Sequence, residues 1–197
     1  MSQQLLIATG NAGKLRELRT LLADLPLELL SLVDFPNIRS VEETGSTFAG
    51  NASLKASGYA RQARVLTLAD DSGLVVDALG GRPGVHSARY LRPDATYPER
   101  IVSLLAELVG VADRHRTARF ICAMRIASSD GEIVFATEKN CEGFIASAPR
   151  GGQGFGYDPV FVPDGFDETF AELSAEVKNR ISHRGLALAA VREFLVS

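Results

Sequence analysis

The chain has 197 residues, with 21 basic and 24 acidic side chains and a formal charge of −3. This length suits one domain over residues 1–197 or two close lobes. The slightly acidic balance argues against a protein that binds nucleic acid through a broad basic face, because neutralising phosphates requires clustered Lys and Arg.

The hydropathy of the sequence does not indicate a membrane protein. No apolar stretch approaches the roughly 20 residues that a membrane-spanning helix needs, and no basic, apolar leader precedes the first expected strand. We therefore expect a cytoplasmic protein that does not insert into a membrane. Cys122 and Cys141 lie in strand-like segments without CxxC spacing, so we expect buried apolar thiols and not a zinc or redox site.

The N-terminal segment LLIATGNAGK, residues 5–14, predicts a buried strand that turns into a helix. The turn would place the free N–H groups and the positive dipole end of that helix beside Lys14, which is typical of an anion site. An ordinary βα turn with a solvated lysine is the alternative. The spacing of the glycines fits neither a Walker A loop nor the dinucleotide motif GxGxxG.

The following segments predict further strands and a helix. We expect a strand at 28–33, a polar loop at 34–45 that includes Glu42 and Glu43, and a helix at 47–64 with Lys55 in its middle. A buried strand at 65–69 is expected to end at Asp70, and 74–79 continues as extended chain. Glu42 and Glu43 are solvated carboxylates unless the fold brings them to Asp71, and Lys55 is either a phosphate contact or a surface charge.

Asp70 and Asp71 are the second chemical signal, because ligands of open α/β sheets bind at the carboxyl ends of strands. In an extended chain the two side chains point to opposite sides, so one can serve the structure and the other a site. Such a carboxylate can bind Mg²⁺ beside phosphates, or it can take a proton from an attacking water. A capped turn, in which Asp and Ser hold backbone N–H groups, is the alternative.

The second half of the chain predicts more strands and several helix starts. Thr96 and Glu99 form a capping box before a helix with apolar positions from 101 to 108, and strands at 119–127 and 132–137 flank a Ser-Ser-Asp-Gly hairpin signal. Extended segments are expected at 139–146 and 160–162. Ser174 and Ser182 are expected to begin helices.

A glycine-rich segment at 151–159 cannot form regular structure. Its glycines would leave Phe155 free to stack on a flat ligand such as a base. Asp158 either accepts a hydrogen bond from a purine ring N–H or caps the turn before Pro159. His183 and Arg184 are donors at a helix start, and donors suit a keto oxygen or a phosphate.

Taken together, these segments resemble one protein family. The motifs ATGNAGK, EETG, FAGNASLKA, ADDSGL, PGVHSARY, GFGYDPVF and ISHRG lie between residues 8 and 185 and are similar to those of the inosine triphosphate pyrophosphatases. The resemblance implies an elongated mixed β-sheet flanked by helices, two lobes with a nucleotide cleft between them, and a homodimer. It also implies Mg²⁺-dependent hydrolysis of ITP, dITP and XTP, which are non-standard purine nucleoside triphosphates, to the monophosphate and pyrophosphate.

The same resemblance implies roles for individual residues. Asp71 would be the base that activates water for attack at the α-phosphorus, and Glu42 and Asp71 would be the metal ligands. The substrate contacts would be Thr9, Gly10, Asn11, Ala12, Gly13, Lys14, Lys55, Ser72, Phe155, Gly156, Tyr157, Asp158, Lys178, His183 and Arg184. Gly50 departs from the family pattern, since many relatives have Glu there, and this removes a carboxylate from the surroundings of the metal site.

Two other functions stay open on the sequence. A nucleotide-binding sensor would hold the same ligands without turnover, and nucleotide recovered unhydrolysed would distinguish it from an enzyme. A sequence-independent binder of single strands would use Phe155 and scattered arginines, but the acidic balance disfavours it.

Overall fold

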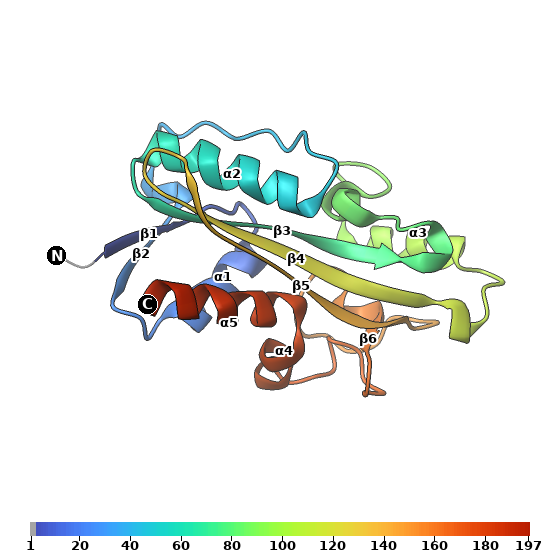
Figure 1. Cartoon of the computed structure of the whole chain (residues 1–197). Helices are drawn as coiled ribbons and strands as arrows, with labels where there is room; N and C mark the ends of the chain where they lie inside the picture. The colour runs from blue at the N-terminus through green and yellow to red at the C-terminus, as the bar shows by residue number, and fades with distance from the viewer. Residues whose placement is uncertain (1–2) are drawn as a thin grey trace. The chain divides into compact units, whose positions relative to one another are not determined.

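The computed structural model describes residues 3–197, which form a six-stranded mixed sheet with helices around it (Figure 1). The strands are β1 (Gln3–Ile7), β2 (Leu27–Ser31), β3 (Leu66–Val76), β4 (Thr117–Ala127), β5 (Ile133–Ile145) and β6 (Phe161–Pro163). The helices are α1 (Ala12–Leu22), α2 (Phe48–Ala63), α3 (Tyr97–Glu107), α4 (Ala175–Ile181) and α5 (His183–Val196). Within this part of the chain, no helix is both long and apolar enough to span a bilayer.

The strand order in the sheet is β2-β1-β3-β4-β5-β6. β1 pairs in parallel with β2, with Gln3 opposite Leu27, and also with β3, with Leu5 opposite Leu66. β6 pairs antiparallel to β5, with Gly143 opposite Pro163. The predicted α/β class with a mixed sheet flanked by helices is therefore confirmed.

The described chain divides into two compact units. Unit 1 contains 3–71, 122–138 and 187–197, and unit 2 contains 72–121 and 139–186. The division falls inside β3, β4, β5 and α5, so each of these elements contributes residues to both units. The prediction of a single domain with two lobes stays a prediction.

In unit 1, helices cover both faces of the strands (Figure 1). Leu5, Ile7 and Leu68 face a core made with α1 and α5, whereas the alternate residues Leu6 and Ala69 face a core made with α2. This alternation follows from the period of two in a β-strand. Residues 70 and 71 of β3 therefore point toward α1 and α2, respectively.

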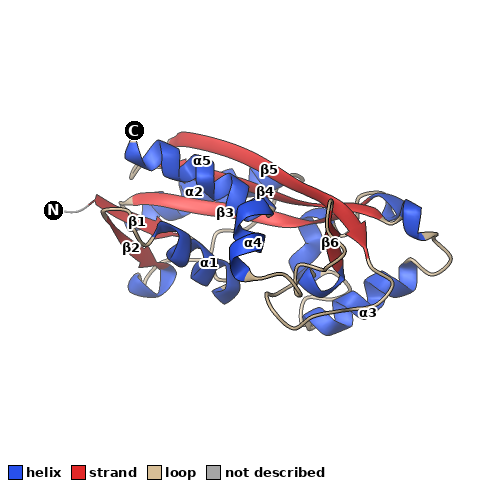
Figure 2. Ribbon diagram, turned by 90° about the horizontal axis from the view of Figure 1, so that it is seen from below, coloured by secondary structure: helices blue, strands red, loops and turns tan. Residues whose placement is uncertain are grey.

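Unit 2, which includes α3 and β6 (Figure 2), has its own core, formed by residues of the strands, by Phe170 and by buried residues of α3. Phe120 contacts Phe161 with ring centroids 4.7 Å apart and stacks on Phe170 at 5.9 Å. Ile101 and Leu104 of α3 are buried in the same core. Tyr97 at the start of α3 also meets Tyr157 of the glycine-rich segment edge-on, with ring centroids 5.6 Å apart.

β3 differs from its prediction, because the strand continues through Asp70, Asp71 and Ser72 to Val76. The expected end of the strand at Asp70 is therefore wrong, and the alternative of a capped turn at 70–73 is excluded. Similarly, the segments expected at 132–137 and 139–146 form one strand, β5. A polar residue in the middle of a segment indicates a turn in a hydropathy pattern. In β3, however, Asp70, Asp71 and Ser72 each meet a polar side chain from a helix, as described below.

The predicted helix starts are confirmed. Thr47, Thr96 and Ser174 each accept a backbone hydrogen bond at the N-terminus of α2, α3 and α4, and Thr96 forms the expected capping box with Glu99. Ser182 Oγ accepts from Gly185 N–H at the start of α5, 3.1 Å away. These caps satisfy backbone N–H groups that a helix leaves open.

Candidate functional site

The turn after β1 is organised by Asn11, which caps α1. Its Oδ1 accepts from the backbone N–H groups of Gly13 and Lys14 at 2.9 and 3.2 Å, and Thr9 Oγ1 accepts from Asn11 N–H at 3.2 Å. Gly10 and Ala12 are exposed, and a Cβ atom on Gly10 would meet nothing within 4 Å. Hydrogen bonds within the protein thus hold the turn, and the space above Gly10 is open, as close approach of a ligand requires.

Lys14 is not a solvated lysine, which excludes the alternative of an ordinary turn with a lysine in water. Its Nζ lies 2.8 Å from Asp70 Oδ2, and the Asp70 side chain is fully buried, whereas that of Lys14 is 13% exposed. A buried carboxylate needs such a partner, because its desolvation is costly. Asp70 therefore fixes the Lys14 ammonium beside the turn.

Asp71 lies on the other face of β3 and contacts two residues of α2. Its Oδ1 is 3.2 Å from Lys55 Nζ, and its Oδ2 accepts from Asn51 Nδ2 at 3.2 Å. Burial raises the pKa of Asp71, although the charges of Lys55 and Lys14 act against this shift. A carboxylate with a raised pKa is better matched to accepting a proton near neutral pH.

Lys55 connects Asp71 to the acidic loop. Its Nζ is also 3.3 Å from Glu43 Oε1, and Lys55 is only 11% exposed in its side chain. Burial lowers the pKa of Lys55, but the charges of Asp70, Asp71 and Glu43 outweigh burial, so its pKa is raised. Lys55 is therefore a permanent cation between a loop carboxylate and a strand carboxylate, and not a surface charge.

We call these residues the lysine–carboxylate cluster: Lys14, Glu43, Asn51, Lys55, Asp70 and Asp71. All of them belong to unit 1. Glu42, the loop residue that the motifs favour as a metal ligand, is exposed, and its neighbour Glu43 is the one that contacts Lys55.

Two carboxylates of this cluster are oxygen donors of the kind that bind Mg²⁺. Glu43 and Asp71 converge on one cation, the Lys55 ammonium, so carboxylates from the loop and from β3 already share a positive group. Mg²⁺ prefers oxygen ligands and is commonly bound through one or two carboxylates together with substrate phosphates. Within residues 3–197 no three His, Cys, Asp or Glu side chains form a metal-binding group. The donor set therefore fits a Mg²⁺ that arrives with a phosphate ligand.

In unit 2, Asp158 organises the glycine-rich loop. Its Oδ2 accepts from Phe155 N–H at 2.8 Å and lies 2.7 Å from Lys178 Nζ of α4, and both charged side chains are less than 10% exposed. Gly154 has a φ of 75°, and a Cβ atom there would lie 2.1 Å from Asp158 Oδ2. Only glycine fits this position, so the loop is shaped around the Asp158 carboxylate.

Two cations flank the Phe155 ring. Lys178 Nζ lies 5.1 Å from the ring centroid and the Arg184 guanidinium carbon lies 5.4 Å from it. Phe155 is half-buried, and both cations lie within the distance of a cation–π contact. We call Phe155, Asp158, Lys178 and Arg184 the Phe155 cluster.

His183 and Arg184 begin α5 and are both buried. The imidazole of His183 stacks on Phe120, with centroids 4.6 Å apart and an interplanar angle of 9°. Arg184 donates to Ser72 Oγ at 2.9 Å. The ISHRG motif therefore places one donor against an aromatic core and the other against β3.

Tyr157 and Gly156, two further residues predicted to contact the substrate, lie against Tyr97 of α3. Tyr157 is 2% exposed, its hydroxyl donates to the Ser87 carbonyl at 3.0 Å, and its ring meets Tyr97 edge-on. Gly156 has a φ of 70° and lies near the Tyr97 ring. These contacts favour a role for Tyr157 in fixing the loop over a role in touching a ligand.

Asn51 was not among the residues expected at the site, whereas Glu42 and Glu43 were both left open as carboxylates that the fold could bring to Asp71. Asn51 and Lys55 are four residues apart in α2, which places them on one face of the helix, so this spacing was an available signal. For Glu43, the choice between two neighbouring loop carboxylates depends on the path of the loop and has no local signal.

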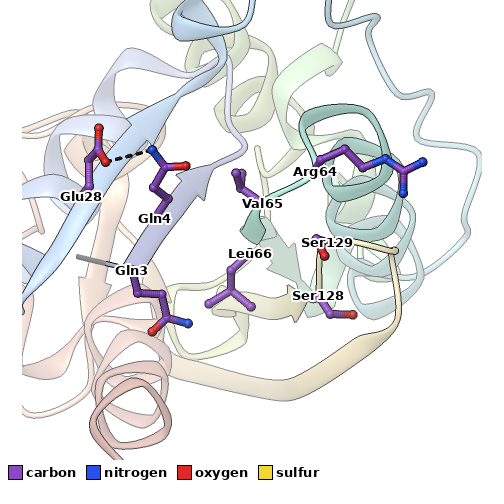
Figure 3. Close-up of a pocket in the computed structure, with 8 residues that line it drawn as sticks. All are labelled: Gln3, Gln4, Glu28, Arg64, Val65, Leu66, Ser128 and Ser129. Carbon is purple, nitrogen blue, oxygen red and sulfur yellow. Dashed lines mark hydrogen bonds between the residues drawn. The ribbon is translucent and has the colours of Figure 1, made fainter. Parts of the chain in front are cut away.

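A separate hollow lies at the opposite ends of the parallel strands from the Thr9–Lys14 turn (Figure 3). It contains none of the predicted site residues and is lined by Gln3, Gln4, Glu28, Arg64, Val65, Leu66, Ser128 and Ser129. Its polar groups are partly satisfied within the protein, as Gln4 Nε2 donates to Glu28 at 2.9 Å.

Comparison with known proteins gives one consistent result. The model of the Ham1 family matches residues 5–194. A dITP/XTP pyrophosphatase of Geobacillus kaustophilus (strain HTA426) is 53% identical over 191 residues, which cover 97% of this chain and 93% of that protein. A HAM1 protein from Coxiella burnetii and the Ham1 protein of Staphylococcus aureus have similar structures, with TM-scores of 0.88 and 0.87, identities of 40% and 36%, and 98% of both chains covered in each case.

Proposed function

The chain belongs to the Ham1 family, and from this premise we propose that it hydrolyses ITP, dITP and XTP to the nucleoside monophosphate and pyrophosphate. The predicted resemblance to nucleotide pyrophosphatases is confirmed, since a relative that is 53% identical carries the name dITP/XTP pyrophosphatase. The role of each residue below is part of the proposal.

The observation that carries the proposal is the Asp71 carboxylate, which is buried, raised in pKa and held by Lys55 and Asn51. Asp71 takes a proton from the water whose oxygen forms a bond to the α-phosphorus. The bond from that phosphorus to the bridging oxygen of the β-phosphate breaks, and pyrophosphate leaves. Lysines close to Asp71 stabilise the negative charge that develops on the phosphate oxygens.

The triphosphate is bound by the Thr9–Lys14 turn together with Lys55. The open space above Gly10 admits a phosphate close to the backbone, and Asp70 holds Lys14 in place for it. Asn11 and Thr9 shape the turn, while Gly13 and Ala12 lie in the first turn of α1, where the helix dipole favours an anion.

The purine is bound by the Phe155 cluster with His183, and Ser72 and Gly156 line the same end of the ligand. Phe155 stacks on the base, and Asp158 accepts from a ring N–H while Lys178, His183 and Arg184 donate. A 6-keto purine presents an acceptor where adenine presents a donor, so a donor-lined site disfavours adenine by leaving polar groups unpaired. Tyr157 holds the loop through its contacts with Ser87 and Tyr97. In this proposal one nucleotide occupies a cleft between two lobes and uses both clusters.

Mg²⁺ is part of the proposal as the cation of the substrate complex. Its protein ligands would be Asp71 and a carboxylate of the acidic loop: the resemblance implies Glu42, which is exposed, while its neighbour Glu43 contacts Lys55. When bound, Mg²⁺ would neutralise charge on the phosphate oxygens. A homodimer is proposed as the state of assembly.

The experiment that tests the function compares the wild-type protein with Asp71→Asn on a panel of ITP, dITP, XTP, GTP and ATP with Mg²⁺. We expect pyrophosphate release from the first three, and a loss of about 10²- to 10⁴-fold in Asp71→Asn, because a general base is removed. Nucleotide that binds stoichiometrically and is recovered intact from wild-type protein would contradict turnover and indicate a sensor. Near-wild-type activity of Asp71→Asn would contradict the role of Asp71.

A further inference from the structure

Asn51, in the first turn of α2, contacts the proposed base Asp71 but takes no part in the steps of the proposed reaction. The side chain is completely buried. Its Oδ1 accepts from the Gly45 N–H at 2.8 Å, and its Nδ2 donates to Asp71 Oδ2 at 3.2 Å. A single amide group thus joins the acidic loop to the middle of β3.

The two contacts require an amide in one orientation. A backbone N–H must face an acceptor and a carboxylate must face a donor, and Asn is the short side chain that offers both. An Asp at this position would set one carboxylate against another, and an apolar residue would leave the Gly45 N–H without its acceptor. Space is limited as well, since a Cβ atom on Gly45 would lie 2.7 Å from Asn51 Oδ1.

We propose that Asn51 is a positioning residue that orients the Asp71 carboxylate and ties the 42–45 loop to it. Lys55 holds one oxygen of Asp71 and Asn51 holds the other, so the plane of the carboxylate is set from two sides. The same amide holds the loop whose Glu43 contacts Lys55, which closes a ring of contacts through the loop, α2 and β3. This role rests on the proposed function, in which the orientation of Asp71 matters for proton transfer.

The contact between Asn51 and Asp71 is tested by exchanging the amide and the carboxylate between the two positions, an experiment that needs no substrate. In Asn51→Asp two carboxylates face each other, and we expect the Tm to fall by about 5 °C or more. In the double variant Asn51→Asp, Asp71→Asn, the amide at position 71 can donate to the new carboxylate and accept from Lys55. We therefore expect the double variant to have a Tm equal to or higher than that of the single variant Asp71→Asn. If Asn51→Asp lowers the Tm equally in the wild-type protein and in Asp71→Asn, the contact between residues 51 and 71 is overturned.

The positioning role is tested by kinetics in Asn51→Ser, which introduces no charge and remains informative if Asn51→Asp fails to fold. We expect kcat for ITP to fall about tenfold to a hundredfold, because a misoriented base is inefficient, with KM changed less than about twofold. The control is Ser53→Ala, which removes a hydrogen bond to Ala49 O in the same helix without touching Asp71. A fall in Tm with kcat unchanged would overturn the proposal, since it would show a structural role alone.

Different results would overturn the proposed function and the positioning role of Asn51. If the wild-type protein releases no pyrophosphate, the proposed function is wrong, and the exchange of groups still decides whether Asn51 orients Asp71. If the wild-type protein is active and Asn51→Ser keeps its kcat, the function stands and the role of Asn51 is overturned.

Discussion

Three consecutive polar residues, Asp70, Asp71 and Ser72, lie in the middle of β3, and each meets a side chain from a different helix. Lys14 of α1 pairs with Asp70, Lys55 of α2 pairs with Asp71, and Arg184 of α5 donates to Ser72. Charge compensation allows carboxylates to remain in a buried strand, where an isolated charge would be expelled or neutralised. The residues proposed for chemistry are thus also the ones that permit the strand to continue.

The Asp70–Lys14 pair gives a test of stability at the level of residues. In Lys14→Met the buried Asp70 carboxylate loses its ammonium, and we expect the free energy of unfolding to fall by about 3–5 kcal/mol. Urea unfolding at pH 7 measures this value. Arg16→Met is the matched control, because Arg16 is exposed on the same helix and should change stability by less than about 0.5 kcal/mol. Equal values for the two variants would show that the ion pair is not needed to bury Asp70.

The sequence could name the charged members of the site but not their partners. Lys14, Lys55 and Asp71 attract attention because they are charged residues within largely apolar segments. The opposite directions of Asp70 and Asp71 follow from strand geometry, and the structure confirms them through Lys14 and Lys55 on the two helices. That Glu43 contacts Lys55, and that Asn51 contacts Asp71, depends on how a loop and a helix pack, which no local pattern records.

Among the elements, α3 is the helix whose beginning the sequence specifies most fully. Thr96 caps it, Pro98 lies in its first turn, and Glu99 accepts from Thr96 N–H at 2.7 Å. Its buried positions Ile101 and Leu104 follow the expected period. Capping and periodicity act within a few residues, so they can be read locally, whereas the continuation of β3 depends on side chains from distant helices.

The capping box predicts a pH dependence of stability. The hydrogen bonds from the Thr96 N–H and hydroxyl, followed by Arg92, lower the pKa of Glu99 from 4.5 to about 2. Because the folded-state pKa is depressed, this stabilisation is fully present above the unfolded value and is lost as the pH falls from about 4.5 toward about 2.

Thermal unfolding of wild type and Glu99→Gln between pH 7 and pH 2.5 measures this effect. We expect the Tm of wild type to exceed that of the variant at pH 7, and the difference to shrink below about pH 4.5. A difference that stays constant over this range would show that the ionised carboxylate of Glu99 does not support the helix.

At the scale of the whole molecule, the two compact units share four elements, since the division cuts through β3, β4, β5 and α5. The sequence contains no linker for such a division, because the chain passes from one unit to the other inside regular structure. The mixed α/β class was predictable from strand and helix patterns, but the division into units was not, as it depends on contacts between distant segments.

This continuity predicts that the chain unfolds in one cooperative step. Loss of the strands in one unit removes the extension of the same strands in the other, so we expect a single calorimetric transition whose enthalpy equals the van't Hoff enthalpy. Scanning calorimetry of wild-type protein measures both values. Two resolved transitions would show instead that the units are independent domains.

The proposed reaction breaks the bond between the α-phosphorus and the oxygen that bridges to the β-phosphate. The position of an oxygen isotope in the products shows most directly whether this bond is broken. Wild-type protein is incubated with ITP and Mg²⁺ in H₂¹⁸O, and the products are analysed by mass spectrometry. Water attack at the α-phosphorus predicts one ¹⁸O in inosine monophosphate and none in pyrophosphate. Label in pyrophosphate, release of inosine diphosphate and inorganic phosphate, or recovery of intact ITP would contradict the role assigned to Asp71 and its neighbours.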